Sequence, residues 1–96
     1  EADNVARFPD APTARGVKHV EELIRCMEDG YEAYLLLVIQ MKGVTRFEPN
    51  WDTHREFGET LQKAQKAGVH ILAYDCLVEP DRMEIQDPVP VRLERD

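Results

Sequence analysis

The chain has 96 residues, which suits one small domain or part of a larger one. Twelve Lys and Arg residues against nineteen Asp and Glu residues give a formal net charge of −7, which excludes a protein that coats DNA through an evenly basic surface. No apolar run approaches the ~18–20 residues that cross a bilayer, so no membrane partner is expected. The first residue is Glu1 rather than Met, and we therefore expect a fragment or a processed chain with sequence missing upstream.

The two cysteines, Cys26 and Cys76, stand far apart and form no Cys-x-x-Cys pair. The chain also begins with a polar, acidic stretch rather than a secretory signal. Together these features predict free thiols in a reducing compartment, hence a cytoplasmic protein. We expect both cysteines to be buried.

The first half of the chain contains one clear helix and one clear strand. Residues 1–12 are polar and contain two prolines, which predicts a loop or a short edge segment. Residues 15–29 carry apolar side chains at three- and four-residue steps, which predicts a helix with Thr13 as N-cap and Gly30 at its end. Residues 32–40 form a continuous apolar run, typical of a strand that is covered on both faces in a parallel sheet.

The second half repeats this order. Residues 41–51 read as a loop, and a helix is predicted over 53–67 with Asp52 as N-cap and Gly68 as its stop. Residues 69–78 predict a second strand, and the strand–helix–strand order predicts a right-handed parallel unit. Residues 83–86 are expected to fold back as an antiparallel edge strand, followed by an extended tail.

The order α-β-α-β predicts an α/β fold with a mixed, mostly parallel sheet and a short antiparallel edge. Two central strands make a thin sheet for two helices, since an independently stable sheet usually needs at least three. We therefore expect residues 1–96 to form a single domain or a partial domain. The expected partners are the missing N-terminal part of the same protein or another chain, including a second copy.

The densest polar cluster lies at the start of the first predicted helix. Arg15, Lys18 and His19 fall on one face within about one turn, and Thr13 leaves the first backbone N–H groups directed outward, which favours an anion. Exposed cations at a helix N-terminus oppose the helix dipole by roughly 0.3–1 kcal/mol each. Their placement therefore indicates a binding function rather than helix stability.

Gly16 is a second departure from a stable helix, because Gly lowers helix propensity by about 1 kcal/mol relative to Ala. A glycine here would let a backbone or a phosphate come close. The alternative is a solvated basic turn that pairs with Asp10, Glu21 and Glu22. The residues alone leave both interpretations open.

Other chemistry is weakly indicated. Asp10 follows Pro9 and reads as a cap, a turn residue or a lone metal ligand. With residues 40–42 it resembles the PD-(D/E)XK nuclease signature only loosely, because Gln40 stands where the second acid would be. The chain has no serine, no zinc-type His and Cys spacing and no Gly-rich phosphate loop. We predict no catalytic residue and no metal ligand from these residues themselves.

Two sets of segments closely resemble the sugar fermentation stimulation protein A family. The first and more specific set lies around the polar cluster: F-P-D-A at 8–11, Thr13, R-G at 15–16, K-H at 18–19 and E-L at 22–23. The second set follows along the chain: Gly30, the strand ending in Gln40, F-E-P-N at 47–50, A-G-V at 67–69 and I-L-A-Y at 71–74.

The resemblance implies a bacterial or archaeal protein more than twice this length. Such proteins join an N-terminal OB-like domain to a C-terminal PD-(D/E)XK nuclease-like domain, bind DNA and are linked to the regulation of sugar (maltose) metabolism. This chain resembles the later part of the second domain. The family's acidic strand residue and Glu-x-Lys element would precede it, so Mg²⁺ is implied for the longer protein and no cofactor for this chain.

The same resemblance places particular residues in a cleft beside those upstream acids. The residues that would contact nucleic acid are Thr13, Arg15, Gly16, Lys18 and His19. Two further residues, Asp10 and Gln40, would line the same cleft.

Three functions stay open. The favoured one is a DNA-binding module that contacts phosphates largely without regard to sequence and serves transcription regulation, with weak binding by this chain alone because of its charge of −7. The second is a metal-dependent nuclease in which Arg15 or Lys18 stabilises the reacting phosphate, although this chain alone would not be an enzyme. The third is a structural fragment that completes a split domain.

Overall fold

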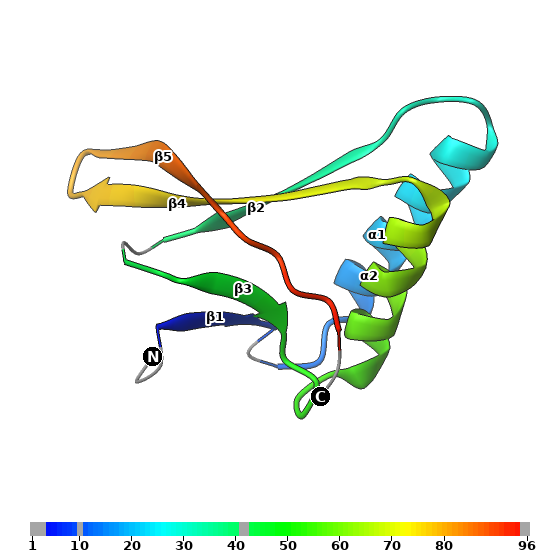
Figure 1. Cartoon of the computed structure of the whole chain (residues 1–96), viewed down its shortest axis with the longest axis horizontal. Coiled ribbons are helices and arrows are strands. Elements are labelled where there is room, and N and C mark those ends of the chain that lie inside the picture. The colour runs from blue at the N-terminus through cyan, green and yellow to red at the C-terminus, as the bar shows by residue number, and fades with distance from the viewer. Residues whose placement is uncertain (1–3, 10, 41–42, 95–96) are drawn as a thin grey trace.

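The computed structural model describes residues 4–9, 11–40 and 43–94. The two helices lie side by side at one end of the molecule, and the strands extend away from them (Figure 1). In order along the chain, the elements are β1 (Val5–Phe8), α1 (Ala14–Glu28), β2 (Tyr34–Ile39), β3 (Arg46–Pro49), α2 (Arg55–Ala67), β4 (His70–Glu79) and β5 (Arg82–Val89).

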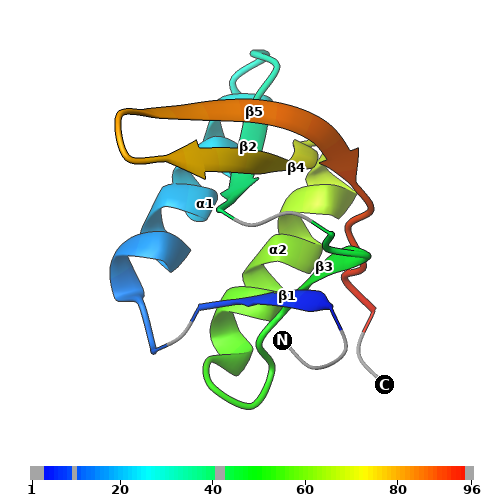
Figure 2. The same ribbon diagram turned by 90° about the vertical axis from the view of Figure 1, so that its left-hand side faces the viewer.

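The strands form two sheets within the described residues, where the sequence predicted one. β1 and β3 pair in parallel, and β2, β4 and β5 form a second sheet in that order. In the second sheet β2 runs parallel to β4, as predicted, and β5 runs antiparallel to β4. Figure 2 shows the three-stranded sheet above the two-stranded sheet, with the helices behind both. The α/β class and the mixed pairing are confirmed, and the single mostly parallel sheet is corrected.

The helix α1 confirms the first predicted helix within one residue at each end. Thr13 is its N-cap, with φ −134°, and its Oγ1 accepts a hydrogen bond from the N–H of Gly16 at 3.0 Å. Gly30 lies just beyond the end with φ +92°, a conformation that suits glycine. Val17 and Val20 are buried on the inward stripe that the periodicity predicted.

The helix α2 starts later than predicted, and Asp52 is not its N-cap. The backbone N–H groups of Thr53 and His54 both donate to the carbonyl of Asn50, at 3.1 and 3.0 Å, so a turn occupies the residues before the helix. His54 is the N-cap and provides no side-chain cap hydrogen bond. Gly68 ends the helix with φ +98°, as predicted. Three apolar residues of the helix are buried in the core: Phe57, Leu61 and Ala64.

The strand β3 lies where a loop was predicted. It is only four residues long and contains a proline, so its local sequence carries little strand signal. Its pairing is non-local: Phe47 is opposite Ala6 of β1 on one side and forms a bridge to Val91 on the other. The N–H of Phe47 donates to the Pro90 carbonyl, and the N–H of Arg92 donates to the Phe47 carbonyl, both at 2.8 Å. The residues after β5 therefore return beside β3.

The hydrophobic core lies between the helices and one face of each sheet. Along β2 the side chains alternate, so Leu35 and Ile39 are buried while Leu36 and Val38 are exposed. The prediction that this strand is covered on both faces is therefore wrong for the residues that the structure describes. The core cluster draws buried residues from all seven elements, from residues 33 and 69 and from the tail: Ala6, Val17, Val20, Ala33, Leu35, Ile39, Phe47, Phe57, Leu61, Ala64, Val69, Ala73, Val89 and Leu93.

The pairing of β4 with β5 contains a bulge in β5, where Gln86 and Asp87 stand opposite the single residue Asp75 of β4. Tyr74 is opposite Pro88 and Cys76 is opposite Ile85, so the register shifts between these two pairs. The side chain of Asp75 accepts the N–H of Asp87 at 2.9 Å, which gives this backbone group a partner at the irregularity. β5 is longer than the predicted strand over residues 83–86.

The two cysteines are both free thiols, as predicted, but their environments differ. Cys76 is buried, and its Sγ donates to the carbonyl of Ile39 at 3.2 Å. Cys26 is exposed on α1, so the prediction that it is buried is wrong. The inward stripe of the helix passes through Ile24 and Met27 and leaves Cys26 outside it.

Candidate functional site

The N-terminal ends of the two helices are held together by specific contacts. The backbone N–H of Thr13 donates to Nδ1 of His54 at 3.1 Å, which joins the N-cap of α1 to the N-cap of α2. The rings of Phe8, at the end of β1, and Phe57, on α2, meet edge to face with their centroids 5.4 Å apart. The N-cap of α1 is therefore joined to the start of α2, which in turn packs against the end of β1.

Gly16 allows the first turn of α1 to lie close to the ring of Phe57. A Cβ added to Gly16 would lie 2.9 Å from Cγ2 of Thr13 and 3.1 Å from Cε1 of Phe57, which is tighter than side chains normally pack. The sequence predicted that this glycine admits a backbone or a phosphate, whereas the observed neighbour is an aromatic ring of α2. Its contact with nucleic acid stays a prediction.

The outward face of the same turns carries the cationic cluster, which we define as Arg15, Lys18 and His19. All three side chains are exposed, and none forms an ion pair or a side-chain hydrogen bond within the described residues. The first turn of α1 contains no acidic residue that could offset the positive helix end. Of the alternative pairing, the contacts with Glu21 and Glu22 do not form, and the contact with Asp10 lies outside the described residues.

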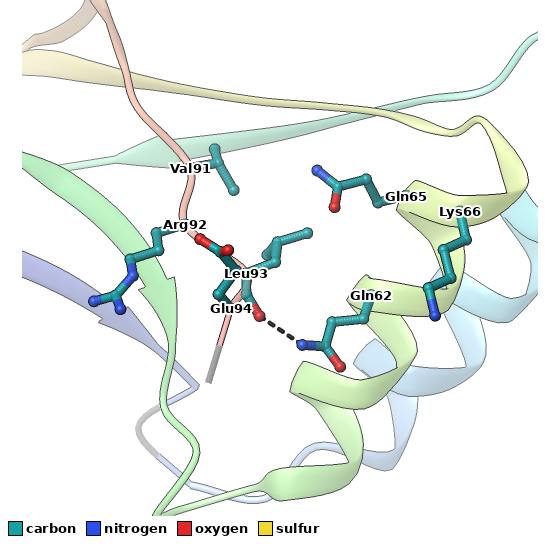
Figure 3. A pocket seen from close by; sticks show the side chains of 7 residues that line it. All are labelled: Gln62, Gln65, Lys66, Val91, Arg92, Leu93 and Glu94. Carbon is teal, nitrogen blue, oxygen red and sulfur yellow. Dashed lines mark hydrogen bonds between the residues drawn. The ribbon is translucent and has the colours of Figure 1, made fainter. Parts of the chain in front are cut away.

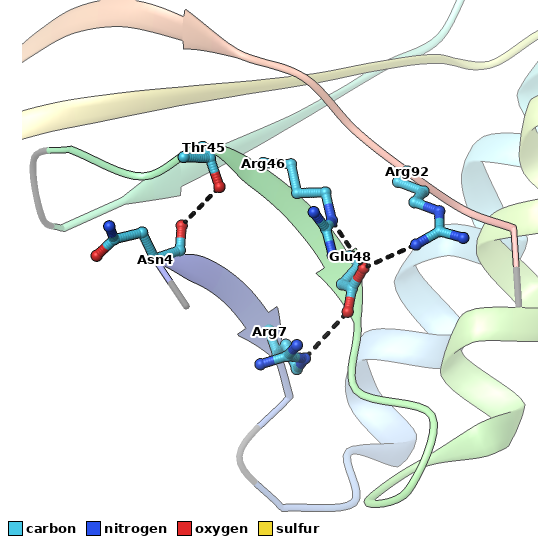
Figure 4. A network of polar contacts seen from close by, with 6 residues as sticks. All are labelled: Asn4, Arg7, Thr45, Arg46, Glu48 and Arg92. Atoms are coloured by element: carbon cyan, nitrogen blue, oxygen red, sulfur yellow. Dashed lines mark hydrogen bonds and ion pairs between the residues drawn. The ribbon is translucent and has the colours of Figure 1, made fainter. Parts of the chain in front are cut away.

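A second group of basic side chains is arranged in the opposite way. Arg7 of β1, Arg46 of β3 and Arg92 of the tail surround the carboxylate of Glu48 (Figure 4). The Arg7 and Arg46 Nε atoms lie 3.0 and 3.1 Å from Glu48 oxygens, and Arg92 Nη1 lies 3.9 Å away. The Glu48 side chain is only 16% exposed. We call this group the Glu48 network, and it ties three segments together.

Two of the cavities that the described residues line lie beside the tail, and the cationic cluster lines neither of these two. The larger, about 570 Å³, lies between α2 and the tail, where Nε2 of Gln62 donates to the carbonyl of Leu93 at 2.7 Å (Figure 3). Its lining is Gln62, Gln65, Lys66, Val91, Arg92, Leu93 and Glu94. The smaller, about 310 Å³, is lined by Arg7, Glu48, Pro49, Asn50, Trp51, Asp52 and Glu94.

The remaining predicted site residues are only partly placed. Asp10 lies outside the described residues. Gln40 is exposed directly after β2, and no hydrogen bond or ion pair in the described part of the chain joins it to the cationic cluster. Their assignment to a common cleft stays a prediction.

The sequence analysis missed Asp75, which is 6% exposed and stands opposite Ile39 at the end of β2. The signal was a single carboxylate inside an otherwise apolar strand. Across the described residues, no three His, Cys, Asp or Glu side chains gather as they would around a metal ion. In the same residues, neither helix has the length and hydropathy of a membrane span.

The family model described as "Sugar fermentation stimulation protein RE domain" (SfsA) matches residues 1–82 of the chain. The chain belongs to the sugar fermentation stimulation protein family. The resemblance in the sequence is thereby confirmed. Membership is supported along nearly the whole chain by relatives that carry the same family name.

The "Sugar fermentation stimulation protein homolog" of Clostridium beijerinckii is 56% identical over 93 residues, which make up 97% of this chain and 41% of that protein. The homolog of Ruminiclostridium cellulolyticum is 55% identical over the same length and the same shares. The chain therefore spans about two fifths of the length of the curated relatives that it matches.

A solved structure has the same fold. "The structure of Pyrococcus Furiosus SfsA in complex with Ca2+" superposes with a TM-score of 0.85 at 28% identity. The match covers 94% of this chain and 39% of that one. The fold of this chain is thus shared with part of an SfsA protein.

Proposed function

We propose that this chain supplies a phosphate-binding surface to a DNA-binding protein of the sugar fermentation stimulation family. The surface is the cationic cluster on α1. The observation that carries the proposal is that Arg15, Lys18 and His19 are exposed on one helix face with no carboxylate to pair with them in the described part of the chain. Such side chains are available to neutralise phosphates.

The other arginines of the described residues have surroundings that differ from those of Arg15, and this difference supports the proposal. Those at positions 7, 46, 55, 82 and 92 each form an ion pair with a glutamate. Arg25 forms none, but it lies in the last turn of α1, where the helix dipole favours a cation. Arg15 lies in the first turn, where the dipole disfavours a cation, and a bound phosphate would reverse that cost.

The contacts are directed at the DNA backbone. Few side chains suited to base edges lie beside the cluster, so binding is largely independent of base sequence. The formal net charge of −7 repels DNA over the rest of the surface, so this chain alone binds weakly. Tight binding would need the remainder of a full-length family member.

The experiment uses a hybrid protein, defined as the Clostridium beijerinckii relative with its matched 93 residues replaced by this chain. Binding to a short DNA duplex is measured across a salt series for the parent and for the Arg15→Ala/Lys18→Ala variant. Because about two phosphate contacts are lost, the variant should bind at least ~10-fold more weakly at low salt. The slope of log affinity against log salt should fall by about 2.

The matched control is Lys63→Ala/Lys66→Ala, which removes the same charge from the exposed side of α2. It should change affinity and salt slope far less. Equal losses in both double variants, or no salt-dependent binding by the parent hybrid, would contradict the proposal.

A second function, metal-dependent cleavage of DNA in a PD-(D/E)XK nuclease-like domain, is favoured by one comparison. The Pyrococcus furiosus relative is described in complex with Ca²⁺. The described residues of this chain do not form a metal site, so the metal ligands would come from elsewhere in the longer protein. Arg15 would neutralise charge on the reacting phosphate. Incubating the hybrid protein and its Arg15→Ala variant with Mg²⁺ or Mn²⁺ and DNA tests this function, and equal background cleavage by both would end it.

The family is linked with sugar metabolism. Under this proposal, the protein acts on sugar metabolism by binding DNA in the cytoplasm and regulating transcription. Two free thiols, Cys26 and Cys76, accord with such a reducing compartment. Expression of sugar-utilisation genes in cells that carry the parent or the Arg15→Ala/Lys18→Ala hybrid would test the regulatory part separately from binding.

A further inference from the structure

One imidazole ring joins the N-terminal ends of the two helices. Nδ1 of His54, the N-cap residue of α2, accepts the backbone N–H of Thr13, the N-cap residue of α1, at 3.1 Å. The His54 side chain is only 14% exposed, and its ring stacks beside that of Phe57 with the centroids 6.4 Å apart. The ring therefore has little freedom to turn away from Thr13.

This hydrogen bond requires a neutral ring. A backbone N–H needs an unprotonated ring nitrogen as its acceptor, and both nitrogens of a protonated imidazole carry hydrogens. In a charged ring, the N–H at Nδ1 would face the N–H of Thr13 across 3.1 Å, where two donors repel each other. Because histidine side chains change charge between about pH 5 and 8, the contact between the two helices is sensitive to pH.

The charged groups around the ring differ from one element to the next. From α2, a carboxylate oxygen of Glu56 lies 3.6 Å from Nε2 of His54, while Arg55 is engaged in an ion pair of its own. In the described part of the chain, neither the cationic cluster of α1 nor Asp52 in the turn before α2 forms a hydrogen bond or ion pair with the ring. From β1, the uncharged Phe8 packs on α2. Glu56 is therefore the described group that stabilises a charged ring.

The start of α1 is held less firmly than the ring. The neighbouring Phe57 is buried, at 3% exposure, whereas Ala14 and Arg15 at the start of α1 are exposed. The first turn of α1 also contains no acidic residue that would stabilise the positive helix end. When the two donors repel each other, we therefore expect the end of α1 to move rather than the ring of His54.

We propose that His54 is a positioning residue for the cationic cluster, which it holds in place when its ring is neutral and releases when its ring is protonated. Protonation exchanges the hydrogen bond with Thr13 for a stronger pair with Glu56. The ring keeps a partner in both states, so the change acts on the start of α1 and not on the whole fold. The effect on DNA rests on the function proposed above, because a cluster held in one position binds phosphates more tightly than a released one.

The test compares the parent hybrid protein with its His54→Asn variant. The side-chain oxygen of asparagine can accept the N–H of Thr13, and asparagine does not change charge with pH. The first measurement is the protection of the Thr13 amide against hydrogen exchange, relative to an unstructured amide at the same pH. From about pH 8 to about pH 5, this protection should fall at least ~5-fold in the parent and stay constant in His54→Asn.

The second measurement is DNA binding by the same two proteins. The other histidines, His19 and His70, are common to both, so the quantity compared is the ratio of the two affinities at each pH. Relative to His54→Asn, the affinity of the parent should fall at least ~3-fold from about pH 8 to about pH 5. If the Thr13 amide responds to pH but the hybrid does not bind DNA, the positioning role of His54 is supported and the DNA-binding function is wrong.

A further pair of variants tests the contact on the other side of the ring. Glu56→Gln removes the anion that stabilises the charged ring, so the loss of Thr13 protection should begin at a lower pH than in the parent. The matched control, Glu59→Gln, removes an equal charge from the same helix and should leave this pH unchanged.

Three results would overturn the proposal. The first is Thr13 protection that does not change with pH in the parent, and the second is an equal change in the parent and in His54→Asn. The third is a parent affinity for DNA that rises, relative to that of His54→Asn, as the pH falls, because the charged ring would then attract DNA instead of releasing the cluster.

Discussion

The cationic cluster and the Glu48 network both contain basic side chains, but these side chains have different surroundings. In the Glu48 network, arginines from three separate segments converge on one largely buried carboxylate. In the cationic cluster, consecutive turns of one helix present their charges to water with no carboxylate partner in the described residues. The first arrangement links segments of the fold, and the second leaves positive charge available to a ligand. Substitutions in the two regions should therefore affect different properties.

The largest effect on folding is expected for Glu48→Gln. This change leaves three guanidinium groups clustered around a neutral amide, so the free energy of unfolding should fall by about 2–4 kcal/mol. Urea unfolding measures the loss. The control is Glu59→Gln, which breaks the exposed pair with Arg55 at 3.1 Å and should cost less than about 1 kcal/mol. Similar losses in the two variants would show that the Glu48 network is not a structural link.

A smaller effect is expected for Thr13→Ala at the N-cap of α1. The change removes the Oγ1 acceptor of the Gly16 N–H, which should lower the unfolding free energy by about 1 kcal/mol. Thr13→Ser keeps the acceptor and should stay close to the parent in thermal unfolding. If Thr13→Ser loses as much as Thr13→Ala, the cap hydrogen bond is not what stabilises this end of the helix.

The smallest effect on folding is expected for Arg15→Glu, and it has the opposite sign. An anion replaces a cation in the first turn of α1, so the free energy of unfolding should rise by about 0.3–1 kcal/mol. The same variant should bind DNA more weakly than the parent. Arg25→Glu, in the last turn, is the matched control and should lower stability by a similar amount. A loss of stability on Arg15→Glu would mean that Arg15 contributes to the fold.

The helices could be predicted closely because their signals are local. The apolar stripe of α1 and the terminal glycines Gly30 and Gly68 lie within the segments they define. The exposure of Arg15 and Lys18 follows from the same periodicity. The start of α2 was misplaced because a turn centred on the Asn50 carbonyl, rather than the Asp52 side chain, decides where the helix begins.

The sheets and the Glu48 network could not be predicted because they depend on partners far away in sequence. β3 is a strand because β1 and the tail pair with it, and nothing in its four residues requires this. Arg7 and Glu48 are separated by 41 positions, so their contact exists only once β1 and β3 have paired. The uncovered face of β2 was missed for a related reason, since an apolar run shows that a strand is suited to burial but not what buries it.

The hydrogen bond from the backbone N–H of Thr13 to His54 couples the imidazole ring of His54 to the N-terminal end of α1, 41 positions away in sequence. Because Nδ1 accepts the backbone N–H, the proton of the neutral ring must reside on Nε2, which lies 3.6 Å from a carboxylate oxygen of Glu56. A polyanion that displaces the first turn of α1 would disturb this tautomer. The ring nitrogen resonances of His54 would then report occupancy of the helix end without any label on the bound molecule.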